Sequence, residues 1–133
     1  MPELLHTVLD AEDVRELAEF YRQLLDLQYR PGDEQPGSGG DDADWLVLTD
    51  QRGHRALAFQ QVSDLPRVTW PDGEVPQQLH LDMTVPSVEH LDRQHRRALG
   101  LGAQLLLDRA DDSEEPLRVY ADPAGHPFCI FVG

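Results

Sequence analysis

The amino-acid sequence predicts an α+β fold made of two tandem βαβββ units. Three observations predict this class: the chain repeats itself once, each half holds one amphipathic helix, and short apolar runs flank each helix. When the chain is aligned with itself so that His6 falls on His80, the match continues without a gap through a strand and the following helix. The other matching pairs are Leu5 and Leu79, Val14 and Val88, Leu17 and Leu91, Arg22 and Arg96, Leu25 and Leu99, and Leu27 and Leu101. Chance explains repeated leucines more readily than two equivalent histidines, so we infer a duplicated unit.

The first half starts with an apolar run at residues 4–9, which predicts a strand. Asp10 and Asp13 follow, and carboxylates at these places favour the N-cap and the positive end of a helix dipole. The helix after them carries one apolar stripe, formed by Val14, Leu17, Ala18, Tyr21, Leu24 and Leu25. Segments rich in turn residues then separate three further predicted strands, at residues 27–30, 45–49 and 56–62.

The second half shows the same order of elements. A strand is predicted at residues 78–85, and Val88 begins a helix whose apolar stripe is Val88, Leu91, His95, Ala98 and Leu99. Gly100 and Gly102 are predicted to stop this helix. Three more strands are predicted at residues 103–107, 117–121 and 128–132.

The connecting segments indicate how these elements are organised. Residues 63–77 hold several prolines and one glycine, which is typical of a loop. We therefore predict a first unit at 3–62, a connecting loop at 63–77 and a second unit at 78–133. A lone βαβββ sheet leaves one face open, so we expect both units to share a single domain over 1–133, or to swap with a second chain.

The composition excludes several classes of partner. The chain has 25 Asp and Glu against 11 Lys and Arg, a formal net charge of −14, and a pI near 4.5. Nucleic acids and anionic membranes are polyanions that favour basic proteins, so we expect neither as a partner. Cys129 is alone, which excludes an intrachain disulfide. The sequence shows neither a signal-peptide pattern nor an apolar run of about 18 residues, so we expect a cytoplasmic protein.

Three segments carry a resemblance to a known family. They are the strand Leu5–Leu9 with His6 inside it, the helix segment Phe20–Leu27 with the letters FYRQLLDL, and the closing segment Asp122–Phe128 with the letters DPAGHPF. Together and in this order they resemble the vicinal oxygen chelate superfamily, and within it the glyoxalase-like branch that is grouped with glyoxalase I, bleomycin-resistance proteins and extradiol dioxygenases. The resemblance covers almost the whole chain. It implies that the two mixed sheets form a half-open cup.

The resemblance also implies where a divalent metal ion (zinc, nickel, manganese or iron) would bind. One ligand comes from the first strand and one from the last strand of each unit, and the first-strand positions fall on His6 and His80. The last-strand positions, where a carboxylate is usual, fall on Gln60 and Cys129. Glutamine is a weak neutral ligand and a buried cysteine more often packs as a small apolar residue. Because glyoxalase I chemistry needs a carboxylate to move a proton, this activity is not expected.

Both histidines have a simpler interpretation, as pocket residues hydrogen-bonded to a neighbour. Asp82 lies two residues after His80 on the same strand face, where it either faces the cup or makes a structural hydrogen bond. A ligand cup needs apolar walls with a few polar groups. The predicted ligand-binding residues are Trp45, Gln60, Trp70, His80, Asp82, Tyr120 and Cys129.

These patterns leave three functions open. The leading hypothesis is a protein that binds a small organic molecule in the cup. The alternatives are a non-catalytic drug-sequestering protein resembling bleomycin-resistance proteins, and a metal-dependent lyase, isomerase or dioxygenase-type enzyme that uses His6 and His80. The resemblance also implies a homodimer.

Overall fold

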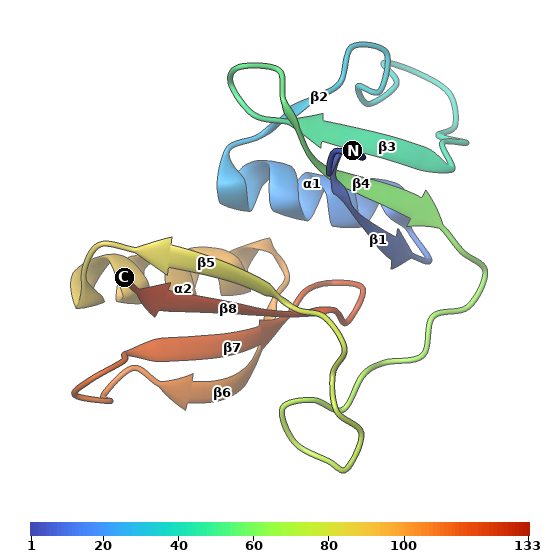
Figure 1. Ribbon diagram of the computed structural model, residues 1–133. Helices are drawn as coiled ribbons and strands as arrows, with labels where there is room; N and C mark the ends of the chain where they lie inside the picture. The colour runs from blue at the N-terminus through green and yellow to red at the C-terminus, as the bar shows by residue number, and fades with distance from the viewer. The chain divides into compact units, whose positions relative to one another are not determined.

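The computed structural model describes residues 1–133. The chain divides into two compact units, Met1–Leu65 and Pro66–Gly133. Each unit contains one helix and a four-stranded mixed sheet (Figure 1). The predicted α+β class with two tandem βαβββ units is therefore confirmed.

Unit 1 contains one helix and four strands in chain order. They are β1 (Thr7–Ala11), α1 (Val14–Leu25), β2 (Gln28–Tyr29), β3 (Trp45–Thr49) and β4 (Arg55–Gln61). The strand order is β1-β4-β3-β2. β1 runs parallel to β4, whereas the β3–β4 and β2–β3 pairs are antiparallel. The parallel pair needs a crossover, which α1 supplies.

Unit 2 repeats this arrangement. Its elements are β5 (Leu81–Val85), α2 (Val88–Leu101), β6 (Gln104–Arg109), β7 (Leu117–Ala121) and β8 (Pro127–Val132). The strand order is β5-β8-β7-β6, with β5 parallel to β8 and the remaining pairs antiparallel. The internal repeat in the sequence thus corresponds to one topology used twice.

Both first strands begin later than predicted. β1 starts at Thr7 and β5 at Leu81, where pairing with β4 and β8 begins. His6 and His80 consequently lie immediately before their strands, outside the ladder of backbone hydrogen bonds. Hydrophobicity alone predicts an extended segment but not where its pairing partner starts.

The two helices are capped by specific residues. Asp13 is the N-cap of α1 and accepts a hydrogen bond from the backbone N–H of Glu16, whereas Asp10, also predicted at this end, belongs to β1. In α2, Gly102 is the C-cap with a φ of 116°, a conformation that favours glycine. Gly100, predicted as a second stop signal, lies inside α2.

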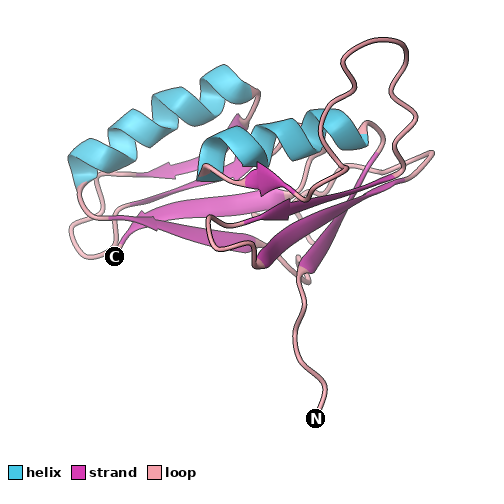
Figure 2. Cartoon of the chain, turned by 90° about the horizontal axis from the view of Figure 1, so that it is seen from above, coloured by secondary structure: helices cyan, strands magenta, loops and turns pink.

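Each helix packs on one face of its own sheet and leaves the other face without a helix (Figure 2). In unit 1, the rings of Tyr21 and Phe59 stack with centroids 6.1 Å apart. In unit 2, Tyr120 and Phe128 stack at 5.1 Å. All four side chains are fully buried. Since side chains alternate along a strand, the residues between these core positions face the open side.

Neither α1 nor α2 has the length and hydrophobicity that a membrane-spanning helix requires.

Candidate functional site

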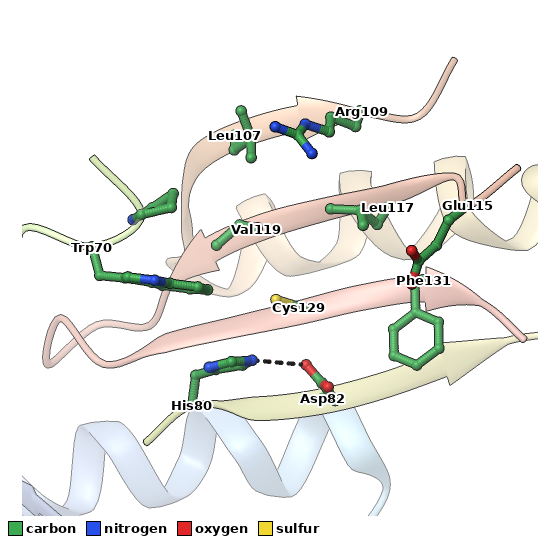
Figure 3. A pocket seen from close by; sticks show the side chains of 11 residues that line it. Trp70, His80, Asp82, Leu107, Arg109, Glu115, Leu117, Val119, Cys129 and Phe131 are labelled. Carbon is green, nitrogen blue, oxygen red and sulfur yellow. Dashed lines mark ion pairs between the residues drawn. The ribbon is translucent and has the colours of Figure 1, made fainter. Parts of the chain in front are cut away.

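A pocket of about 390 Å³ lies on the helix-free face of the sheet in unit 2 (Figure 3). Every strand of this sheet contributes to it, together with the segment that precedes β5. Its lining residues are Trp70, Pro71, His80, Asp82, Leu107, Arg109, Glu115, Leu117, Val119, Cys129 and Phe131.

Strand alternation explains which side chains reach this pocket. In β7, Leu117 and Val119 line it, while Arg118 and Tyr120 point to the side of α2, where Arg118 donates to the backbone of Leu91. β8 follows the same pattern, so that Cys129 faces the pocket. The helix and the pocket therefore occupy opposite faces of one sheet.

Three potential metal ligands meet at the edge of the pocket formed by β5 and β8. Asp82 and Cys129 are direct partners in the parallel β5–β8 pairing. His80 Nε2 lies 3.3 Å from Asp82 Oδ1 (Figure 3). The donor atoms of all three residues lie within 4.8 Å of one another, with Cys129 buried and the other two exposed. We call His80, Asp82 and Cys129 the β5–β8 cluster.

The cysteine of the cluster is protonated at neutral pH. Burial, reinforced by the charge of Asp82 and by a hydrogen bond to it, raises the pKa of the Cys129 thiol to about 11. The Asp82 carboxylate therefore accepts from the thiol on one side and contacts His80 on the other. This carboxylate joins the sulfur and the imidazole into one polar group.

Trp70 covers the histidine of the cluster. The two rings stack with centroids 4.7 Å apart and an interplanar angle of 17°. Trp70 belongs to the segment predicted as a connecting loop, which here forms part of the pocket wall. The stacked indole restricts rotation of the imidazole and shields one of its faces from water.

Unit 1 has a related arrangement around His6. Its ring lies against Trp45, with centroids 6.0 Å apart and tilted by 53°. The Nδ1 atom of His6 is buried without a hydrogen-bond partner. Desolvation, together with the nearby Arg55 and Arg30, lowers the pKa of His6. A neutral imidazole with an unused nitrogen is suited to metal binding, and the role of His6 as a metal ligand stays a prediction.

The strand registers change the expected equivalence of Gln60 and Cys129. Cys129 pairs with Asp82 in unit 2, and the corresponding pair in unit 1 is Ala58 with Val8. Gln60 lies two residues further along β4, exposed and beside Trp45 on β3. By strand pairing, the counterpart of Cys129 is thus an alanine, which offers no ligand atom.

Tyr120 is placed differently from the expected ligand contact. It is fully buried on the α2 side of the sheet, and its hydroxyl lies 2.9 Å from His95 Nδ1. Arg118 is engaged on the same face, in ion pairs with Asp92 at 3.0 Å and Asp108 at 3.2 Å. Neither residue lines the pocket, because both point to the opposite face of the sheet from Val119, the partner of Cys129 in β7.

More than half of the pocket lining was not predicted from the sequence. The four apolar residues Leu107, Leu117, Val119 and Phe131 were predicted only as strand residues, and Arg109 and Glu115 had no predicted role. Strand alternation counted from Cys129 would have identified Phe131, but positions on β6 and β7 required the register. Of the predicted ligand-binding residues, the pocket contains Trp70, His80, Asp82 and Cys129.

Comparison with known proteins identifies the class to which this fold belongs. A glyoxalase/bleomycin resistance protein/dioxygenase family enzyme from Burkholderia phytofirmans PsJN is 17% identical, with a TM-score of 0.70 and 98% of each chain covered. The fosfomycin resistance protein FosX from Mesorhizobium loti is 14% identical, with a TM-score of 0.68 over 100% of this chain and 93% of that one. The Listeria monocytogenes FosX, in complex with Mn(II) and sulfate, is 16% identical, with a TM-score of 0.66 and the same coverages.

The family follows from the sequence itself. The profile of the glyoxalase-like domain matches residues 6–131, and the chain therefore belongs to the glyoxalase-like domain family. No curated protein sequence matches significantly. The three structural similarities above, at 14–17% identity, establish the shared fold.

The donor set of the β5–β8 cluster fits a divalent metal ion. It combines an imidazole nitrogen, a carboxylate oxygen and a sulfur atom, the three donor types that protein zinc sites use. A thiolate favours borderline ions such as zinc over hard ions such as manganese. The cluster thus fits a divalent ion, and its sulfur atom favours zinc over manganese.

Proposed function

We propose that this chain binds a small organic molecule in the pocket of unit 2. The observation that carries the proposal is the pocket itself, a concave space of about 390 Å³ on the face of the sheet opposite α2. Pockets for small ligands generally measure about 300–1,000 Å³ and combine apolar walls with a few convergent polar groups. The pocket has both features.

The distribution of side chains indicates what kind of molecule fits. Leu107, Leu117, Val119 and Phe131 supply apolar contacts along the sheet. Charged groups lie at two separate places, with Arg109 and Glu115 near the β6–β7 end and the β5–β8 cluster opposite them (Figure 3). A ligand with an apolar body and a polar group at each end matches this arrangement.

The comparisons support a small ligand. A point mutant of the Listeria monocytogenes FosX, which is 16% identical with a TM-score of 0.70, is in complex with Mn(II) and 1S,2S-dihydroxypropylphosphonic acid. That molecule is a short organic acid with polar groups along its length. We do not extend the proposal to glyoxalase I chemistry, because residue 129 is a thiol where the family resemblance implies a carboxylate.

A fluorescent probe tests the pocket directly. Anilinonaphthalene sulfonate combines an aromatic body with one anionic group, and we expect it to bind the native chain saturably, with one probe per chain. Leu117→Trp fills the pocket and should abolish this binding. Leu105→Trp is the matched control, because Leu105 is exposed on β6 and its partner in β7 is Tyr120, on the α2 side of the sheet.

Two outcomes contradict the proposal: no saturable binding by the native chain, or equal binding by both tryptophan variants. Displacement of the probe by a panel of small organic acids, amines and sugars then gives the ligand class. The cytoplasmic location and the homodimer implied by the sequence stay predictions, and light scattering at micromolar concentration measures the mass that tests the homodimer.

A further inference from the structure

We propose that the β5–β8 cluster is a binding site for a thiophilic divalent cation of the zinc type, in which Asp82 supplies the carboxylate that the last strand lacks. The site shares its pocket with the proposed organic ligand but does not require that ligand. It shares His80 and Cys129 with the ligand set implied by the family resemblance, and differs from it in Asp82, the partner of Cys129 in the β5–β8 pairing, which takes the place of His6 and Gln60.

The geometry requires only small side-chain movements. Ligands around a tetrahedral ion at about 2.0–2.3 Å lie roughly 3.3–3.8 Å from one another. His80 Nε2 and Asp82 Oδ1 already lie 3.3 Å apart, and all three donor atoms fall within 4.8 Å. Asp82 is exposed, so its side chain can adjust toward the other two donors.

The charges of the donor set also suit a divalent cation. A carboxylate and a thiolate together balance two positive charges, and a neutral imidazole adds a third donor without further charge. A cysteine binds a metal as the thiolate, so the cation takes the place of the thiol proton, which is released to solvent. Three protein ligands leave a coordination position for water or a ligand atom.

The surroundings favour a defined site over a transient surface contact. Val119 and Phe131 border the cluster with apolar surface, and Trp70 holds the His80 ring in one plane. Apolar surroundings and neighbours that fix a ligand's orientation strengthen metal binding. The alternative is a metal-free hydrogen-bonded cluster, in which Asp82 accepts from the thiol and from the imidazole.

Cobalt(II) spectroscopy separates these two interpretations. Chelator-treated protein is titrated with Co²⁺, whose bond to a thiolate produces a near-ultraviolet charge-transfer band. We expect this band to saturate at one Co²⁺ per chain, and Zn²⁺ to displace it. Cys129→Ser should remove the band, and Asp82→Asn should weaken Co²⁺ binding by at least about 10-fold, since even outer-shell partners cost 10–100-fold.

Two controls change the same residue types outside the cluster. His54→Ala removes an exposed imidazole from the β3–β4 turn, and Asp111→Asn removes an exposed carboxylate from the β6–β7 loop. Both should bind Co²⁺ like the native chain. The absence of a charge-transfer band in the native protein, or its persistence in Cys129→Ser, overturns the proposal.

The Asp82→Asn variant keeps the test valid if Cys129→Ser folds poorly, because Asp82 is exposed. Unchanged Co²⁺ affinity in Asp82→Asn also overturns the assignment. Probe binding by the chelator-treated chain reports separately on the organic-ligand pocket, so a failure of one proposal is distinguishable from a failure of the other.

Discussion

His95 is a partly buried titratable side chain on the α2 side of unit 2. It lies between α2 and β7, with its Nδ1 2.9 Å from the Tyr120 hydroxyl. Desolvation by burial, and then the positive charge of Arg118, lower the pKa of His95, although Asp108 and Asp92 oppose the shift. The folded chain therefore holds this imidazole neutral over part of the range in which the unfolded chain protonates it.

The consequence is a stability that decreases in mild acid. In the unfolded chain the imidazole is exposed to water and has the ordinary histidine pKa of about 6.5. The neutral imidazole therefore makes its full contribution to the free energy of unfolding above that pH. This contribution declines as the pH falls toward the lowered pKa of His95 in the folded chain. His95→Gln keeps a hydrogen-bonding group and removes the titration. We expect the melting temperature of this variant to change less between about pH 7 and pH 5 than that of the native chain.

Gln94→Ala serves as the control, because it changes the neighbouring side chain on α2 and removes no titratable group. His6, whose pKa is also lowered, adds a contribution of the same sign in the native chain and in both variants. A native pH profile identical to that of His95→Gln would contradict the role assigned to His95.

At the same scale, the sequence predicted part of the site. Trp70, His80, Asp82 and Cys129 were all predicted as ligand contacts and do line one pocket. Tyr120 was included as well, as a candidate contact for an anionic ligand, but it lies on the α2 side of the sheet. Only the pairing of β7 with β8 shows to which face of the sheet its side chain points. That pairing is not a local contact, and no local sequence pattern encodes it.

Among the elements, α1 depends on one capping side chain. The Asp13 carboxylate accepts from the N–H of Glu16, and loss of an N-cap of this kind costs about 1 kcal/mol. We expect Asp13→Ala to lower the free energy of unfolding by about this amount in urea denaturation. Glu12→Ala removes a neighbouring exposed carboxylate without touching the cap, so an equal loss there would show that charge, rather than capping, is responsible.

The end of α2 offers a second test with two glycines. Gly100 lies inside the helix, and a Cβ added there meets nothing within 4 Å. Gly100→Ala should therefore stabilise the chain by about 0.5–1 kcal/mol. Gly102 has a φ of 116°, which side-chain-bearing residues rarely adopt, so Gly102→Ala should destabilise by about 1–2 kcal/mol.

Thermal or urea denaturation of the two variants measures this difference directly. The same sign of change in both would mean that the helix ends elsewhere than at Gly102. Composition alone could not separate the two positions, since both glycines are typical stop signals and only the backbone conformation distinguishes a helix interior from a C-cap.

Element order and type were predictable because hydrophobic periodicity is local. β3 and β7 begin and end at the predicted residues, and both helices begin where their apolar stripes begin. The starts of β1 and β5 were placed too early, since the apolar residues before them have no partner strand. Strand ends depend on the neighbour as much as on the sequence of the strand itself.

At the scale of the whole molecule, the dominant property is the net charge of −14. The segments 33–44 and 108–115 hold ten of the 25 acids, five each, mostly at exposed positions. Some of these carboxylates are engaged, such as Asp41, which forms a 2.7 Å ion pair with Arg15. Its neighbour Asp42 is exposed, and no ion pair involves it. Adjacent acids can therefore have opposite effects on stability.

This difference predicts the response of the chain to salt. Raising NaCl from about 10 mM to about 150 mM shortens the Debye length from about 30 Å to about 8 Å, which weakens repulsion among exposed charges. The melting temperature of the native chain should therefore rise over this range.

Asp42→Asn should raise the melting temperature at low salt and reduce its salt dependence, because it removes only repulsion. Asp41→Asn has the same change in charge but breaks the contact with Arg15, so it should lower the melting temperature. Equal effects of the two substitutions would mean that net charge alone, and not the pairing of individual carboxylates, governs the stability of this acidic protein.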